Sequence, residues 1–359
     1  MSTDIQAAPA TSAPPQGPVR VERRLPRFAP LGLFLAGLAL GAGLSALTGF
    51  AVTSTVIYGV VLGTLAVYLA SRAVEGRRKA TDRLVTSLVT TAFGIAMIPL
   101  VSLVYTVLDK GLARFDSAFF TNSMFRVVGE GGGAYHAILG TVIITALATL
   151  ISVPIGLMTA IYLVEYGSGR LKRAITFFVD VMTGIPSIVA GLFAFALFTL
   201  LFGNDFRAGI MGAVALSVLM IPVVVRSCEE VLKLVPNELR EASYALGVPK
   251  WRTVVKVVLP TAIAGLGTGV TLAVARVVGE TAPLLITVGL ITGTNLNPFD
   301  GRMATLPVFA YYQLTQPGTA TQAFLDRAWT AALVLIILVM ALNVVARLIS
   351  RFFAPSTGR

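Results

Sequence analysis

Long apolar runs, separated by short polar stretches, dominate the chain. A run of roughly 18 or more apolar residues is long enough to cross a bilayer as a helix. Charge interrupts two of the runs, at Asp180 and at Arg276 with Glu280. The pattern predicts an all-α polytopic membrane protein with about eight transmembrane helices. The predicted spans are residues 30–47, 52–71, 84–108, 137–164, 181–204, 208–225, 257–275 and 328–346.

Composition supports a membrane protein, and the distribution of basic residues predicts its orientation. Of the 359 residues 56% are hydrophobic and 13% are charged, against about 25% charged in soluble domains. The net charge of +11 does not indicate nucleic acid, because the basic residues collect in short stretches between apolar runs. With the N-terminus inside, 21 of the 28 Lys and Arg residues fall in inner segments, six in outer segments, and Arg276 in the membrane. The positive-inside rule therefore predicts that both termini are cytosolic.

The predicted spans divide the chain unevenly. The first two lack charges, and a basic stretch separates them from six further helices. Two long outer segments, 109–135 and about 293–327, are suited to docking an external partner. The expected divisions are a disordered cytosolic tail (1–29), an accessory transmembrane hairpin (30–71), a basic cytosolic linker (72–83) and a six-helix transmembrane domain (84–353) with a cytosolic loop at 227–260.

The cytosolic loop has the pattern of two short helices. An amphipathic helix is expected from Glu238 to about Leu246, ending at Gly247, since glycine adopts a left-handed conformation at least cost. Pro249 suits the first turn of a second helix, and Pro260 is expected to open the next membrane helix. We call residues 238–256 the knuckle. The alternative is an ordinary amphipathic connector.

Charges inside the predicted spans are candidates for a substrate path. Arg276 and Glu280 are spaced i, i+4, which places them on one face of a helix. They form either a self-neutralising structural pair or an arginine aimed at an anion path, since guanidinium matches oxyanions by two-point contacts. Arg226 ends a span, as either a positive-inside anchor or a second anion contact.

The fifth span contains a predicted break. Gly184 and Pro186 interrupt it, and Thr183 and Ser187 bring hydroxyl groups to the break, which forms either part of a pore or an ordinary kink. For Asp180 a buried pair with an arginine is the simplest interpretation.

The remaining candidate features also have simpler structural interpretations. The glycine run 129–133 forms either an anion cradle or, more simply, a flexible connector. The single Cys228 and single His136 indicate neither a disulfide framework nor a multi-histidine metal site. The chain contains no G-x-x-x-x-G-K-[ST] phosphate loop.

The sequence resembles a known permease family. Glu241-Ala242, Gly247 and Leu259-Pro260 resemble the "EAA" loop of ABC importer permeases, with Ser243 where a second Ala is usual. Beyond the loop, the resemblance is to PstA-type permeases of bacterial phosphate-specific ABC importers, over about three quarters of the chain. It rests on G-E-G-G-G-A-Y-H (129–136), T-G-I-P-S-I-V-A-G-L (183–192), P-V-V-V-R (222–226), V-P-N-E-L-R-E-A-S-Y-A-L-G-V-P-K-W (235–251) and A-R-V-V-G-E-T-A-P-L-L (275–285).

This resemblance implies a type I importer permease in the bacterial inner membrane, with the extra N-terminal hairpin outside the usual core. It implies four kinds of partner: a second permease (PstC-like), two copies of an ATPase (PstB-like) that bind ATP and Mg, an external phosphate-binding protein (PstS-like), and membrane lipid. The chain itself is expected to be non-catalytic and without a cofactor. Arg276, Glu280, Arg226, Thr183 and Ser187 are the expected path residues. The ATPase-coupling residues are expected to be Glu241, Ala242, Ser243, Gly247, Pro249, Trp251 and Pro260.

Three alternatives stay open at this point. Sulfate and molybdate are also tetrahedral oxyanions that Arg276 suits. Asp180 and Glu280 also suit proton carriers of an ion-coupled secondary transporter. A membrane enzyme is disfavoured, because the chain offers no convincing pair of nucleophile and base.

Overall fold

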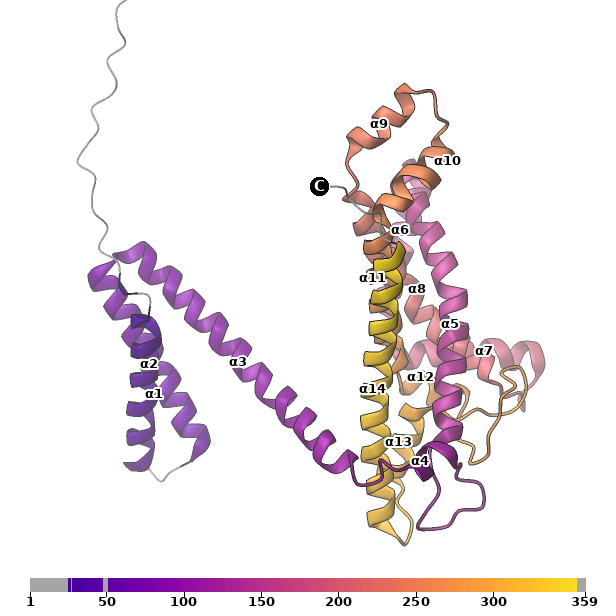
Figure 1. Ribbon diagram of the computed structural model, residues 1–359, viewed down its shortest axis with the longest axis horizontal. Coiled ribbons are helices and arrows are strands. Elements are labelled where there is room, and N and C mark those ends of the chain that lie inside the picture. The colour runs from indigo at the N-terminus through magenta and orange to yellow at the C-terminus, as the bar shows by residue number, and fades with distance from the viewer. Residues whose placement is uncertain (1–24, 27, 48–50, 354–359) are drawn as a thin grey trace, which may run out of the picture. The chain divides into compact units, whose positions relative to one another are not determined.

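The computed structural model describes residues 25–26, 28–47 and 51–353, and these form helices and connecting loops (Figure 1). The chain divides into two compact units, Met1–Leu103 and Val104–Arg359. The predicted tail, 1–29, lies almost entirely outside the described residues. In the described part, seven helices are long and apolar enough to cross a membrane, or up to eight if one bent pair is counted as a span.

The first unit begins with a tight helical hairpin. Helices α1 (Ala29–Leu47) and α2 (Val52–Val74) meet at glycines: Gly37 lies against Gly63, and Gly41 against Gly59. A Cβ atom on Gly37 or Gly41 would overlap the backbone of the other helix. Small residues let the backbones of two membrane helices approach this closely. Close packing of this kind drives association in lipid, because apolar side chains gain little by exchanging lipid for one another.

Glu75 fixes the turn between α2 and α3 (Arg77–Gly111). Its carboxylate accepts hydrogen bonds from Arg83 Nε (2.6 Å) and Nη2 (2.8 Å), from Ser71 Oγ and from the backbone N–H of Leu25. The Arg83 guanidinium lowers the pKa of Glu75 to about 2. The segment expected to be a linker, 72–83, consists of the end of α2, a short turn and the start of α3. The charged residues from Arg72 onward marked the end of the apolar run in the sequence. The helical hydrogen bonding of α2 and α3 nevertheless includes many of these charged residues.

The second unit is a helical bundle around α5, α8 and α11 (Figure 1). Small residues again allow close contact, since Gly156 of α5 lies against Val224 of α8, and Gly269 of α11 lies against Ser227. The elements are α4 (Ser117–Thr121), α5 (Tyr135–Ile161), the π-helical turn η1 (Tyr162–Tyr166), α6 (Gly169–Thr183), α7 (Ser187–Phe202), α8 (Gly209–Lys233), α9 (Asn237–Ala245), α10 (Lys250–Thr253), the π-helical turn η2 (Val254–Val258), α11 (Leu259–Val278), α12 (Ala282–Thr287), α13 (Leu306–Thr315) and α14 (Thr321–Phe353).

The predicted fifth span, 181–204, is two helices. The chain bends by 107° between α6 and α7, and Gly184 and Pro186 occupy the ends of the two helices as the sequence predicted. Figure 1 shows α7 running across the bundle, whereas α5, α8 and α14 run along it. Asp180 consequently lies near the end of α6 rather than inside a straight membrane helix.

The segment 293–327, which was expected to be a long loop, is only partly a loop. Its centre forms α13, in which Leu306 and Phe309 are buried against α5 and α14. The Asn, Pro and Gly residues that suggested a loop lie mostly before and after this helix. The apolar stretch around 303–309 is too short to span a bilayer, but it is long enough to form a buried helix.

The glycine run is held by two arginines. Arg327 is fully buried and donates through Nη1 to the carbonyls of Gly129 (2.8 Å) and Gly131 (3.0 Å). Arg114 donates to the carbonyl of Gly132. Gly129, Gly131 and Gly132 have positive φ, a conformation in which L side chains are strained. The run is thus a fastened loop rather than a flexible connector, and its carbonyl oxygens face cations of the protein itself.

Candidate functional site

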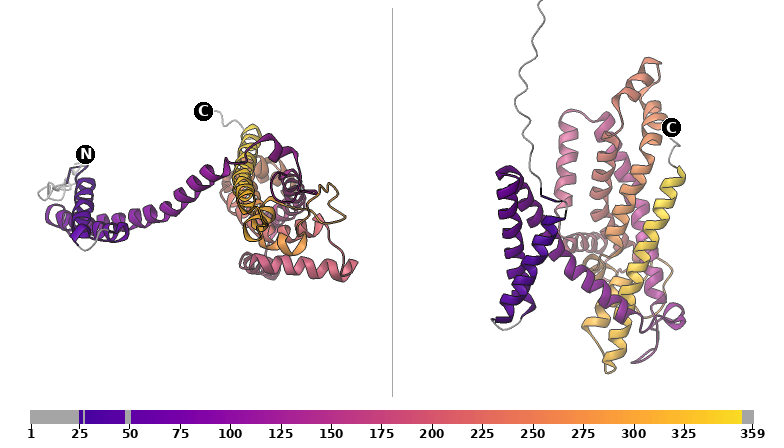
Figure 2. Two further views of the ribbon diagram at one scale, coloured as in Figure 1. Left: turned by 90° about the horizontal axis from the view of Figure 1, so that it is seen from below. Right: turned by 60° about the vertical axis from the view of Figure 1, so that its left-hand side comes forward.

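The knuckle projects beyond one end of the bundle (Figure 1 and the right-hand view of Figure 2). Helix α9 ends in a two-bond cap, in which Val248 N–H donates to Ser243 O (3.2 Å) and Gly247 N–H to Tyr244 O (2.9 Å). This pairing is the Schellman motif, which needs a left-handed residue, and Gly247 has φ +75°. The turn predicted at Gly247 is therefore present, for the predicted reason.

The second helix of the knuckle runs straight into the next membrane helix. Pro249 precedes α10 as its N-cap, and α10, η2 and α11 form one helical stretch, Lys250–Val278. Pro260 lies in the first turn of α11, as the sequence predicts, although η2 joins α11 to α10 without a break. The π-helical turn accommodates the proline, because a π turn already departs from the i→i−4 hydrogen bonding that proline cannot complete. The knuckle and α11 are thus joined without a hinge loop.

Ser243 lies inside the knuckle. Its side chain is buried, and its hydroxyl is 2.8 Å from the hydroxyl of Thr253, which is also buried. A hydrogen bond therefore joins α9 to α10 at the position where the family usually has alanine. Within this chain, the Ser243 side chain therefore contacts Thr253 rather than the surface of the knuckle.

The other predicted loop residues lie on the surface. Glu241, Ala242, Gly247 and Pro249 are exposed, and 58% of Trp251 is exposed. Three further apolar side chains at or beside the knuckle are exposed, namely Leu234, Leu246 and Val255. Exposed large apolar side chains on a polar projection are typical of a docking surface.

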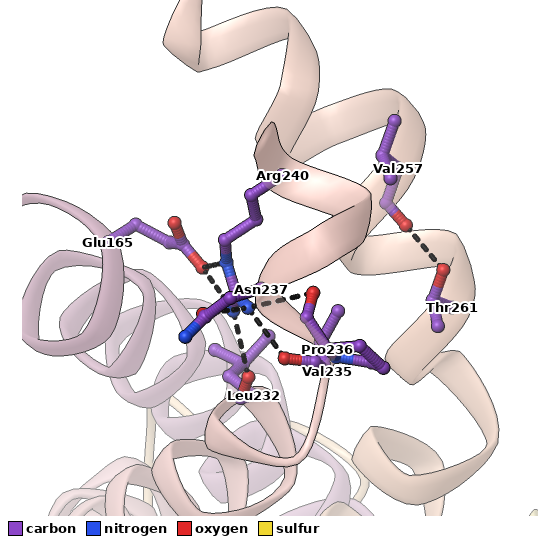
Figure 3. A network of polar contacts seen from close by, with 8 residues as sticks. All are labelled: Glu165, Leu232, Val235, Pro236, Asn237, Arg240, Val257 and Thr261. Atoms are coloured by element: carbon purple, nitrogen blue, oxygen red, sulfur yellow. Dashed lines mark hydrogen bonds and ion pairs between the residues drawn. The ribbon is translucent and has the colours of Figure 1, made fainter. Parts of the chain in front are cut away.

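Arg240 fastens the base of the knuckle, and sequence analysis gave it no role (Figure 3). Its guanidinium donates to Glu165 Oε1 from Nε (3.0 Å) and Nη2 (2.8 Å). It also donates to the carbonyls of Leu232 and Val235. Seventy-five residues separate Arg240 from Glu165, so no local spacing pointed to this pair.

Arg276 and Glu280 are not stacked on a helix, contrary to the i, i+4 prediction. Helix α11 ends at Val278 with Gly279 as its cap, so Glu280 lies beyond the helix. No hydrogen bond or ion pair joins the two side chains in the described part of the chain. Arg276 is exposed on the last turn of α11, where a cation interacts favourably with the helix dipole.

Arg226 belongs to a chain of charges between α6 and α8. Its guanidinium is ion-paired with Asp180, and Nη1 lies 2.7 Å from Glu229 Oε2. Lys233 Nζ contacts the other oxygen of Glu229 at 2.7 Å. The arginine partner expected for Asp180 is thus present, but the pair is not buried, because the side chains of Arg226 and Asp180 are 31% and 59% exposed.

Thr183 and Ser187 flank the break between α6 and α7. Thr183 is exposed and its hydroxyl donates to Val179 O (2.9 Å) within its own helix, while Ser187 is half-buried at the start of α7. Helix α7 packs on α12 where Gly191 meets Pro283. Glu280 lies just before α12, and Arg276 lies on the last turn of α11 that leads to it. The break and the charged helix end therefore belong to neighbouring parts of the bundle.

Comparison with known proteins matches the chain to transport permeases. Residues 152–359 match the family described as binding-protein-dependent transport system inner membrane component. The chain is 50% identical over 286 residues to the phosphate transport system permease protein PstA 1 of Mycobacterium tuberculosis, covering 79% of this chain and 91% of that protein. It is 36% identical over 274 residues to PstA of Yersinia pestis, covering 76% and 90%.

Solved structures agree on the fold. A bacterial alginate ABC transporter, in complex with an alginate pentasaccharide-bound periplasmic protein, has a chain that aligns with a TM-score of 0.54 at 12% identity, covering 77% of this chain and 96% of that one. At this identity the likeness concerns the fold alone. Family match, relatives and apolar helices together identify a multi-pass inner membrane protein. The chain belongs to the binding-protein-dependent transport system inner membrane components and, among them, to the PstA-type ABC permeases.

Proposed function

We propose that this chain forms half of the membrane path of an ATP-driven phosphate importer. The observation that carries the proposal is the 50% identity to a phosphate transport system permease over 91% of that protein's length. The chain would act as a conduit with two conformations, alternately open to each side, and would break no bond of its substrate.

The proposed partners are a homologous second permease (PstC-like), two copies of an ATPase (PstB-like) that bind ATP and Mg, and an external phosphate-binding protein (PstS-like). Support for ATPase docking comes from the knuckle, whose exposed residues include Glu241, Trp251 and Leu246. The excess of Lys and Arg in alternate loops supports a cytosolic knuckle and cytosolic termini. Helix α14 ends at the same end of the bundle as the knuckle (Figure 1).

The proposed anion path includes Arg276. A charged side chain within the hydrocarbon costs roughly 2.5–3.5 kcal/mol on insertion scales, so it normally faces a cavity or a partner. Arg276 is exposed on this chain, which suits a side chain facing a water-filled path between the two permeases. Glu280, Thr183 and Ser187 are proposed as further path residues, since α7, which begins at the break, contacts α12 where Gly191 meets Pro283.

Arg226 is proposed as a contact nearer the cytosolic mouth. In this structure Asp180 and Glu229 occupy its guanidinium. An incoming phosphate would replace the more exposed carboxylate, that of Asp180, because both present paired oxygen atoms to the same donors. Anion contact and the link between α6 and α8 would then be mutually exclusive at Arg226.

Uptake tests the cargo directly. The complete complex in proteoliposomes should accumulate radiolabelled phosphate, and a large excess of sulfate or molybdate should leave the rate almost unchanged. Competition by sulfate equal to that by unlabelled phosphate would refute the phosphate assignment while leaving the permease role intact.

A further inference from the structure

Arg240 brings together three parts of the second unit at the base of the knuckle (Figure 3). It lies on α9. Its Nη2 donates to Leu232 O in the last turn of α8 at 3.1 Å, and its Nη1 donates to Val235 O, just beyond the cap of α8, at 2.6 Å. Nε and Nη2 reach Glu165 Oε1 on η1, the direct continuation of α5. One side chain thus holds the knuckle, α8 and α5.

The pair is buried although the knuckle itself is exposed. The side chains of Arg240 and Glu165 are 12% and 4% exposed, and Ser243 is the buried residue of α9. Removing two charges from water costs energy that their attraction repays only when the geometry is excellent, so a buried pair is weak evidence for stability. Its directional hydrogen bonds, however, fix where one element sits relative to another.

Helix α5, unlike α8 and α11, has no direct backbone link to the knuckle. The knuckle is covalently joined to α8 by a short turn and to α11 by continuous helix. Within the described part of the chain, the hydrogen bonds and the ion pair between α9 and η1 are those of Arg240 with Glu165. Movement of the knuckle therefore reaches α8 and α11 through the backbone, whereas it reaches η1 through side chains: the Arg240–Glu165 ion pair, and Lys250 Nζ of α10, which lies 5.2 Å from the centre of the Tyr166 ring. Along its length α5 also packs on α8, where Gly156 meets Val224.

We propose that Arg240 and Glu165 are positioning residues that carry movement of the knuckle to α5, so that α5, α8 and α11 turn as one body. The proposal rests on the proposed function, because it assumes that an ATPase moves the knuckle. Two π-helical turns, η1 and η2, lie beside the contact. Such turns occur often at functional sites, and the directional contact of Arg240 with Glu165 fixes the end of α5 relative to the knuckle.

The test compares Arg240→Gln, Glu165→Gln and the double variant in the complete complex in proteoliposomes. Labelled phosphate uptake and ADP formation are measured on the same vesicles, and co-purification of the ATPase subunits is measured on the same preparations. Arg170→Gln is the matched control. Arg170 lies on α6, shortly after Glu165 in the sequence; it is exposed and takes part in none of the ion pairs of the described residues.

Each single variant should lower the phosphate moved per ATP by about tenfold, within the range of measured coupling energies. ATP hydrolysis and ATPase co-purification should stay near wild type, and the double variant should be no worse than Arg240→Gln, because both changes break one contact. Arg170→Gln should behave as wild type.

Two results would overturn the proposal. One is unchanged phosphate moved per ATP in both single variants. The other is loss of ATPase co-purification in Glu165→Gln, which would make the pair a support for docking rather than a link to α5. Failure of the proposed function is a separate result, since the wild-type complex would then show no phosphate uptake.

Discussion

Gly247 gives the sharpest test of whether the shape of the knuckle matters. A Cβ added at Gly247 meets no atom within 4 Å, so a substitution acts through the backbone alone. Alanine at φ +75° costs about 1–2 kcal/mol, because its Cβ approaches the carbonyl oxygen in the left-handed region. Asparagine tolerates that region better. Proline fixes φ near −65° and removes the N–H that bonds to Tyr244 O.

The backbone strain at position 247 should lower the amount of phosphate moved per ATP by a graded amount. A cost of 1–2 kcal/mol changes a population by about 5- to 30-fold, so phosphate moved per ATP should fall in the order Gly, Asn, Ala, Pro. Hydrogen exchange of residues 237–253 in the purified complex should rise in the same order. Gly76→Ala is the control, since Gly76 has φ +90° and equally open space but lies in the first unit. Full coupling in Gly247→Pro, with the complex intact, would refute the reasoning.

Other predictions concern the path and the first unit. Arg276→Ala should abolish phosphate uptake while the complex still assembles, and normal uptake would remove Arg276 from the path. Because the folded-state pKa of Glu75 lies at about 2, below its usual 4.5, its contribution to stability is present above about pH 4.5 and is lost as the pH falls toward 2. Hydrogen exchange at the α2–α3 turn should therefore rise on acidification in the wild type, and Glu75→Gln should lack this step. Deletion of residues 1–71 should leave a membrane-inserted second unit that still binds the ATPase, whereas loss of the whole complex would make the hairpin integral.

The apolar runs predicted most of the helices because burial in lipid is a property of each segment by itself. The turn at Gly247 and the break at Gly184 and Pro186 were equally local, since each depends on the backbone preferences of one or two residues. The helix ends were less predictable. Apolar runs mark the stretch that contacts hydrocarbon, whereas α3, α8 and α14 continue into polar residues.

The contacts that build the site could not be predicted from local sequence patterns. Arg240 meets Glu165, and Arg226 meets Asp180, across distances in sequence that no spacing rule covers. The i, i+4 pairing of Arg276 with Glu280 failed for the opposite reason: the spacing was right, but α11 ends at Val278 before the second residue. Gly279, the cap of α11, was the signal in the sequence that a helix end was near.

ATP-dependent uptake tests the central claim most directly. Proteoliposomes containing the complete complex receive labelled phosphate and the binding protein on the side opposite the knuckle, and ATP on the knuckle side. The account predicts accumulation that requires ATP on the knuckle side and persists after ionophores dissipate the ion gradients. Accumulation without ATP that collapses with the ion gradient would contradict it.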